Sequence, residues 1–191
     1  SNWKTVLGAN YAKSVFDQDT INSADKSPVR ILYVNNAQIN YTLNTAISTK
    51  INSKFSTKVG VITELMSLNL FSETREFSPN WKPTLDFNGS AILSQEYIQG
   101  KYAFNEKISV TGGLHSQQFS LNGSISLEPR AALKYKLNSK NSFTLGYGLH
   151  SQTQALSVYF YKQPNANGTF NHDNELLGFS QSHHFVLGYE L

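Results

Sequence analysis

The chain of 191 residues contains no cysteine and no apolar run as long as a membrane-spanning helix requires. The absence of cysteine excludes disulfide bonds, and it fits either a surface compartment or a protein that needs none. The missing run excludes a helical membrane protein. The amino-terminal residues also lack a charged segment followed by an apolar core, so no export signal is visible.

The sequence also lacks the common signatures of catalysis. It has no Ser/His/Asp set, nucleophile elbow, glycine-rich phosphate loop or pair of carboxylates at a spacing typical of catalysis. Its 16 basic residues give a net charge of +3, but they are dispersed and form no basic stripe. We therefore predict a protein that is not an enzyme, needs no cofactor and does not bind nucleic acid.

Regular alternation of apolar and polar residues is what the chain does have. Between residues 126 and 154, two alternating segments are joined by the turn-forming residues 138–141. Each apolar face extends over about ten residues, enough for a tilted strand to cross a bilayer. The same rhythm predicts about eight strands, near residues 3–11, 39–47, 55–70, 98–104, 108–114, 126–137, 143–149 and 185–191.

The connections between these segments alternate in length. Those near 50–54, 105–106 and 138–141 are short, whereas those near 17–30, 72–90 and 155–182 are long, polar and rich in Asn, Ser, Pro and Gly. This pattern is typical of outer-membrane barrels. We predict an all-β, antiparallel, up-and-down transmembrane β-barrel segment of about eight strands over residues 1–191, with short periplasmic turns and long extracellular loops.

Three strings carry a family resemblance: LEPRAALKYKLNSKNSFTLGYGLHSQ, the preceding GGLHSQQFSLNGS and the later SHHFVLGYE. Together they resemble the barrel of TonB-dependent receptors, in particular the Bacteroidetes-type family that carries a carboxypeptidase-like regulatory domain. The similarity covers residues 92–191, and residues 1–71 are compatible with it. Such receptors have a barrel of about 22 strands, a plug inside it and a periplasmic box that engages TonB.

The resemblance implies a fragment, about a third of such a barrel, because plug, box and regulatory domain are not recognisable and the last strand pattern stops part-way. It implies a bacterial outer-membrane location and import of a nutrient, with iron complexes, glycans and peptides all open. The implied partners are outer-membrane lipid, the TonB complex through the missing amino-terminal part, and a surface lipoprotein. Two alternatives remain: a complete eight-stranded barrel of structural or adhesive type, and a soluble secreted β-sandwich that binds a ligand.

Polar residues on the strands form the candidate site. Matching like faces across the two turns sets Arg130 opposite both His115 and His150, and lysine or arginine facing lipid costs about 2–4 kcal/mol, so this face is predicted to be the lumen. We predict a lumen-facing polar belt that either contacts substrate or plug, or forms a lattice of hydrogen bonds and ion pairs that fixes strand register. Buried polar groups need partners, which favours the lattice. The belt consists of Tyr97, His115, Glu128, Arg130 and His150.

Two further features have competing interpretations. His183 and His184 are adjacent in a strand and point to opposite faces, so they cannot chelate one ion and no metal site is predicted. The aromatic residues of the last long connection are candidate ligand contacts, although an aromatic girdle at the membrane interface explains them equally well. They are Tyr159, Phe160, Tyr161 and Phe170.

Overall fold

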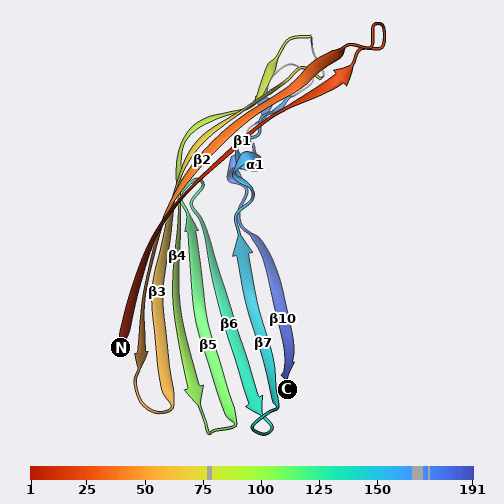
Figure 1. The fold of residues 1–191 in the computed structure, drawn as a ribbon. Helices are drawn as coiled ribbons and strands as arrows, with labels where there is room; N and C mark the ends of the chain where they lie inside the picture. The colour runs from red at the N-terminus through yellow and green to blue at the C-terminus, as the bar shows by residue number, and fades with distance from the viewer. Residues whose placement is uncertain (77–78, 165–169, 172) are drawn as a thin grey trace.

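The computed structural model describes residues 1–76, 79–164, 170–171 and 173–191, and within them one antiparallel sheet of eight strands dominates (Figure 1). The strands follow each other in chain order without a crossover. The predicted all-β, antiparallel, up-and-down fold is therefore confirmed. The strands are β1 (Asn2–Ile21), β2 (Pro28–Lys50), β3 (Phe55–Thr74), β4 (Lys82–Ala103), β5 (Ile108–Phe119), β6 (Ser124–Lys136), β7 (Ser142–Gln152) and β10 (Ser180–Glu190).

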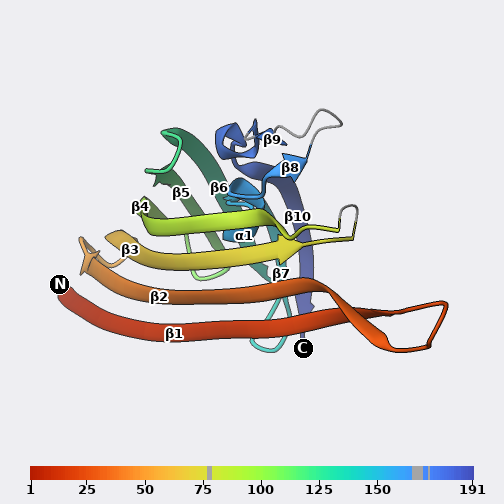
Figure 2. The same cartoon turned by 90° about the horizontal axis from the view of Figure 1, so that it is seen from above.

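The sheet is curled into an open half-barrel, seen end-on in Figure 2. In the described residues β1 and β10 are its two edges and do not pair with each other. The connection from β7 to β10 holds the remaining elements: α1 (Leu156–Tyr159), the short pair β8 (Gln163–Pro164) and β9 (Phe170–Asn171), and the 3-10 helix η1 (Asp173–Leu176). No helix in the described part of the chain is long and apolar enough to span a membrane.

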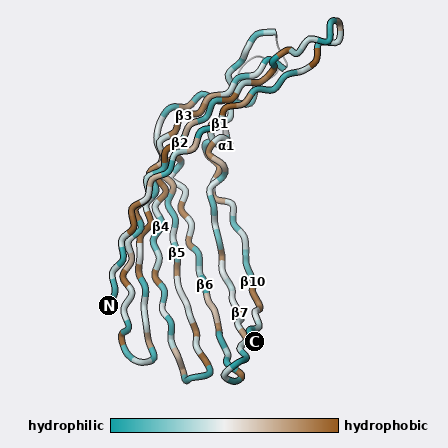
Figure 3. Tube along the Cα trace, viewed as in Figure 1, coloured by the Kyte–Doolittle hydropathy of each residue, from teal (hydrophilic) through white to brown (hydrophobic). Residues whose placement is uncertain are grey.

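Alternation along each strand gives the sheet two different faces, and Figure 3 shows hydrophobic and hydrophilic residues interleaved along the strands. On the convex face, strand register aligns apolar side chains into a row that crosses six strands. Its members are Leu187, Leu145, Leu133, Val110, Tyr102 and Phe55. The concave face carries most of the strand lysines and Arg130. The sheet is therefore apolar outside and polar inside along β5 to β10.

The same side-chain-to-backbone interaction forms all three turns at the end of the sheet where both termini lie. Each turn contains the pattern Asn-x-Lys, and the Asn Oδ1 accepts backbone N–H groups from residues two and three positions further on. Such a side chain stabilises a tight turn without a following helix. The three residues are Asn52, Asn105 and Asn138, so the predicted short turns are confirmed at these positions.

The predicted long loops at 17–30 and 72–90 are wrong. β1 and β2 continue to a turn at residues 22–27, and β3 and β4 continue to residues 75–81. Loop-like composition was overridden because each strand hydrogen-bonds its neighbour in nearly continuous register. Bulges at Gln18/Asp19 and Ser72/Glu73 interrupt that register, and a bulge increases local twist. Figure 1 shows the extended strands leaning away from the rest of the sheet.

The apolar core lies on the concave face of these extended strands. Met66, Leu68 and Leu70 of β3 pack with residues of β4 and with Phe119 at the end of β5. Tyr159 and Phe160 cover them from the connection after β7, which explains the position of α1 inside the curve in Figure 2. The concave face is thus apolar and covered at one end, and polar towards the turns.

Candidate functional site

The concave surface of β4 to β7 holds the predicted polar residues, but β5, β6 and β7 pair in a different register from the predicted one. His115 pairs with Glu128 and Arg130 pairs with Gly148, so the predicted pairing of Arg130 with His115 and His150 is wrong by two residues. A slip of two keeps every side chain on its face. Alternation therefore predicted the face correctly, while the turns set the register: Gly123, at φ +70°, closes the turn between β5 and β6.

Glu128 is the centre of the site, with none of its surface exposed. Its Oε2 atom accepts a hydrogen bond from Nη2 of Arg130 at 2.6 Å and lies 3.0 Å from Nδ1 of His115. Its Oε1 atom accepts from Nε2 of Gln117 at 2.5 Å, from Oγ of Ser126 at 3.2 Å and from the backbone N–H of Ser151 at 3.1 Å. A buried carboxylate is tolerated only when it is paired and hydrogen-bonded in this way.

This network joins three strands. Nε2 of Gln117 also donates to the backbone carbonyl of Ser151 at 2.7 Å, so β5 is tied to β7 across β6. The contacts on Glu128 come from β5, β6 and β7. The arrangement is that of a lattice holding strands in register. Gln117 is not part of the predicted belt, although it lies two residues after His115 on the same face. The sequence had no signal for the backbone donor of Ser151, because any residue supplies that group.

His150 lies beside this network. Its ring centroid is 4.7 Å from that of His184 on β10. Gly148 makes room for the ring, since a Cβ there would lie 2.8 Å from Nε2 of His150. His150 is not among the described hydrogen-bond partners of Glu128, so the predicted belt separates into a bonded centre and neighbours.

Tyr97 is the second neighbour. It pairs with His115 from β4, and its ring lies over Gly60 of β3, where a Cβ would approach the Tyr97 hydroxyl to 2.5 Å. Nζ of Lys58 is 5.4 Å from the centroid of the same ring, a cation–π distance. Tyr97 therefore positions a cation, a role that the sequence did not indicate.

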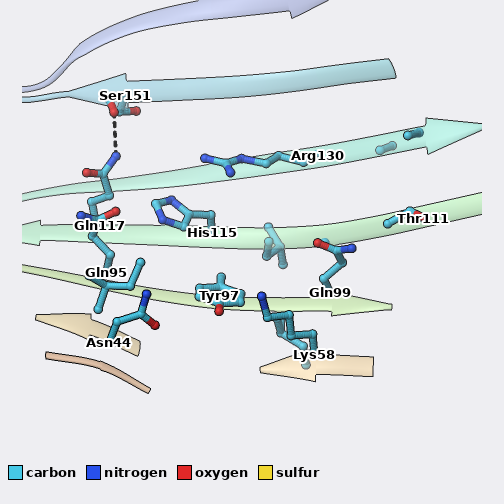
Figure 4. Close-up of a pocket in the computed structure, with 16 residues that line it drawn as sticks. Asn44, Lys58, Gln95, Tyr97, Gln99, Thr111, His115, Gln117, Arg130 and Ser151 are labelled. Carbon is cyan, nitrogen blue, oxygen red and sulfur yellow. Dashed lines mark hydrogen bonds between the residues drawn. The ribbon is translucent and has the colours of Figure 1, made fainter. Parts of the chain in front are cut away.

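A hollow of about 620 Å³ lies along this surface between β2 and β7. Figure 4 shows amide, hydroxyl and cationic side chains around it, and the lining residues come from the six strands β2 to β7. Hydrogen-bond donors line the hollow, and no carboxylate is among its lining residues. The nearby Glu128 is buried, and its oxygens are already hydrogen-bonded. The residues that supply these hydrogen-bond donors include Asn44, Lys58, Gln95, Tyr97, Gln99 and Arg130.

Two of the four predicted aromatic ligand contacts, Tyr159 and Phe160, are buried and unavailable to a ligand. Tyr159 and Phe160 are 1% and 5% exposed, and Phe160 stacks on Phe87 with ring centroids 3.5 Å apart. They form the lid of the core, so neither a free ligand platform nor a membrane girdle describes them. Tyr161 is exposed, and the side chain of Phe170 lies outside the described residues.

The adjacent histidines have separate partners. Nδ1 of His183 lies 3.0 Å from the hydroxyl of Tyr147, while Nε2 of His184 lies 2.6 Å from Oγ of Ser182. Within the described ranges, no group of three or more His, Asp or Glu residues is arranged to hold a metal ion.

Comparisons with protein-family models, with curated proteins and with solved structures found no match to this chain.

Proposed function

We propose that this chain forms part of the wall of an outer-membrane β-barrel of the TonB-dependent receptor type, which imports a nutrient into a bacterium. The observation that carries the proposal is the sidedness of the sheet. The convex face presents exposed leucine and aromatic side chains in continuous rows, whereas the buried Glu128 and its partner Arg130 lie on the concave face. Lipid outside and a polar lumen inside require this distribution.

Strand length supports the same proposal. β5, β6, β7 and β10 have 11 to 13 residues, and a tilted strand needs about 9–11 to cross the hydrocarbon layer. The short turns would lie at the periplasmic rim, and the extended ends of β1 to β4 would stand outside the membrane. These ends would meet the nutrient or a surface lipoprotein first.

The two free edges support a barrel that is completed by further strands. β1 is exposed along its whole length and β10 along nearly all of it. An unpaired edge of this length is an aggregation hazard that barrels remove by closure. Import would be driven through TonB, so the proposal requires no nucleotide site in this region.

Two structural observations bear on the alternatives. A closed eight-stranded barrel requires β1 to pair with β10, and they do not pair in the described residues. A β-sandwich requires a second sheet over the exposed leucines, and the described part of the chain forms only the two-residue strands β8 and β9 besides the main sheet.

Adjacent substitutions on opposite faces of β6 test the proposal. Leu133→Lys places a charge on the convex face, and Ala132→Lys places it on the concave face, beside a wall that already holds Lys134. In a lipid-embedded barrel the first costs about 2–4 kcal/mol near the midplane, while the second is tolerated. Membrane fractionation and denaturant unfolding in bilayers measure both. If Leu133→Lys leaves insertion and stability unchanged, the convex face does not meet lipid and the proposal fails.

A further inference from the structure

A second hollow, of about 500 Å³, lies on the concave face near the turn end of β2, β3 and β4. It shares Lys58 and Gln99 with the hollow described above, so the two are contiguous. Three lysines line it, accompanied by serine and threonine residues and two amides, and no carboxylate is among its lining residues. We propose that this hollow binds a small polyanion, a solute carrying two or three carboxylate or phosphate groups. The inference rests on the proposed function, because it takes the concave face as the one that meets the imported solute.

Strand register places the three lysines on one face of the sheet, in neighbouring positions. Lys50 of β2 pairs with Ser56 of β3, and Ser56 pairs with Lys101 of β4, so both lysines lie in one row across the sheet. Two strand spacings separate their Cα atoms by about 10 Å. Lys58 follows Ser56 by two residues and projects from the same face. Flexible lysine side chains at these positions can converge on a ligand that bridges two strands.

The positive charge of this hollow is not neutralised within the described residues. Two carboxylates on the concave face of more distant strands have other partners: Glu128 is bound by Arg130, and Glu190 accepts from Nζ of Lys134 at 2.6 Å. Glu64, on the concave face of β3, is not among the residues that line this hollow. None of the five ion pairs in the described part of the chain contains Lys50, Lys58 or Lys101. A hollow with this positive charge lowers the free energy of a bound anionic ligand through charge-assisted hydrogen bonds.

Lys58 is also positioned by its neighbours. Its ammonium group lies over the ring of Tyr97, which in turn occupies the space that Gly60 leaves free. A cation held over an aromatic face retains its charge for a second partner on the open side. Ser48, Ser56 and Gln99 add neutral donors around it. The hollow therefore offers both charged and neutral hydrogen-bond donors, as a ligand with several anionic oxygens requires.

Calorimetric titration of the detergent-purified protein with citrate and, separately, with pyrophosphate tests the inference. The two probes distinguish carboxylate from phosphate chemistry. We expect the triple variant Lys50→Gln/Lys58→Gln/Lys101→Gln to weaken binding at least about tenfold. The matched control is Lys54→Gln/Lys107→Gln/Lys140→Gln, which removes the same charge from the three turns at the same end and should change affinity less than about twofold.

The salt dependence is a second measurement that needs no variant. Added sodium chloride should weaken wild-type binding steeply, because exposed charges are screened. Failure of the wild type to bind either anion at millimolar concentration overturns the inference, as does an equal loss in both triple variants. Membrane fractionation separates the two proposals: an outer-membrane protein that binds neither anion overturns the inference alone, whereas recovery in the soluble fraction overturns the proposed function.

Discussion

The first four strands and the last four strands of one sheet are built differently. β1 to β4 contain 20 to 23 residues each, and β5, β6, β7 and β10 contain 11 to 13. On the concave face, the long strands pack apolar residues under Tyr159 and Phe160, while the short strands are joined by the buried Glu128. The inner faces of the two halves are therefore stabilised by different interactions, apolar packing in the first and a polar network in the second.

The extra length of β3 and β4 has both pairing partners and cover, whereas the equally long β1 has a pairing partner alone. The extra length of β3 and β4 carries Leu68, Leu70 and Leu85 on its concave side, which would be exposed without the connection after β7. The short strands need no such cover, because polar groups that satisfy each other can face a wet surface. The following predictions test this division, from the largest expected effect to the smallest.

Removing the charge at the centre of the short half should have the largest effect. Glu128→Gln replaces a fully buried carboxylate, the acceptor for five groups, with an amide that faces His115 and the partly exposed Arg130. Breaking a buried pair by changing one partner costs about 3–5 kcal/mol, and unfolding in denaturant measures it. The control is Glu96→Gln, since Glu96 is an exposed carboxylate that accepts from Oγ of Ser94. Equal losses in the two variants would contradict the lattice interpretation.

Truncation in the core should affect the long half next. Leu68→Ala removes a side chain that is 2% exposed, and core Leu→Ala changes cost about 2–5 kcal/mol. Leu65→Ala on the same strand is the control, because Leu65 is 39% exposed on the convex face and should cost clearly less. Protection of backbone amides in β3 and β4, measured by hydrogen exchange, should fall with Leu68→Ala while β6 and β7 stay protected. Loss of protection across all strands would mean that the two halves are not separate.

The hydroxyl of Tyr159 provides a finer test of the cover. It accepts the backbone N–H of Gln154 at 3.1 Å, which fixes the entry to α1. Tyr159→Phe keeps the packing and removes this acceptor, at a cost of about 1 kcal/mol. Tyr161→Phe should have no measurable effect, since Tyr161 is exposed. Thermal unfolding of both variants checks the difference, and the same melting temperature for both would contradict a role for this hydrogen bond.

The turn between β1 and β2 should give the smallest effect. The hydroxyl and the backbone N–H of Ser27 donate to Asp25 and hold the pKa of that carboxyl below its ordinary value. A folded pKa that is lowered contributes stability above the unfolded value of about 3.8, and that stability is lost as the pH falls through the folded pKa. The amide resonance of Ser27 should therefore titrate below pH 3.8 in nuclear magnetic resonance spectra. Ser27→Ala should raise the titration midpoint, and an unchanged midpoint would contradict the assignment.

The sequence by itself determined the architecture and the faces. Period-2 alternation predicted the antiparallel sheet, the apolar convex rows and the side of the sheet on which His115, Glu128 and Arg130 lie. These features follow from alternation alone, because successive strand residues always point to opposite faces. The Asn-x-Lys pattern of the short turns was equally present in the sequence.

Only the tertiary structure decided register, strand ends and the role of the aromatic triplet. Register depends on turn geometry, such as the positive φ of Gly123. Alternation does not report register, because a slip of two residues leaves every side chain on the same face. The ends of β1 to β4 depend on hydrogen bonds to neighbouring strands, and polar composition does not report them. Burial of Tyr159 and Phe160 depends on contacts with β3, β4 and β5, which lie far away in the chain. Local pattern fixes the direction of a side chain, whereas long-range pairing and packing fix what it meets.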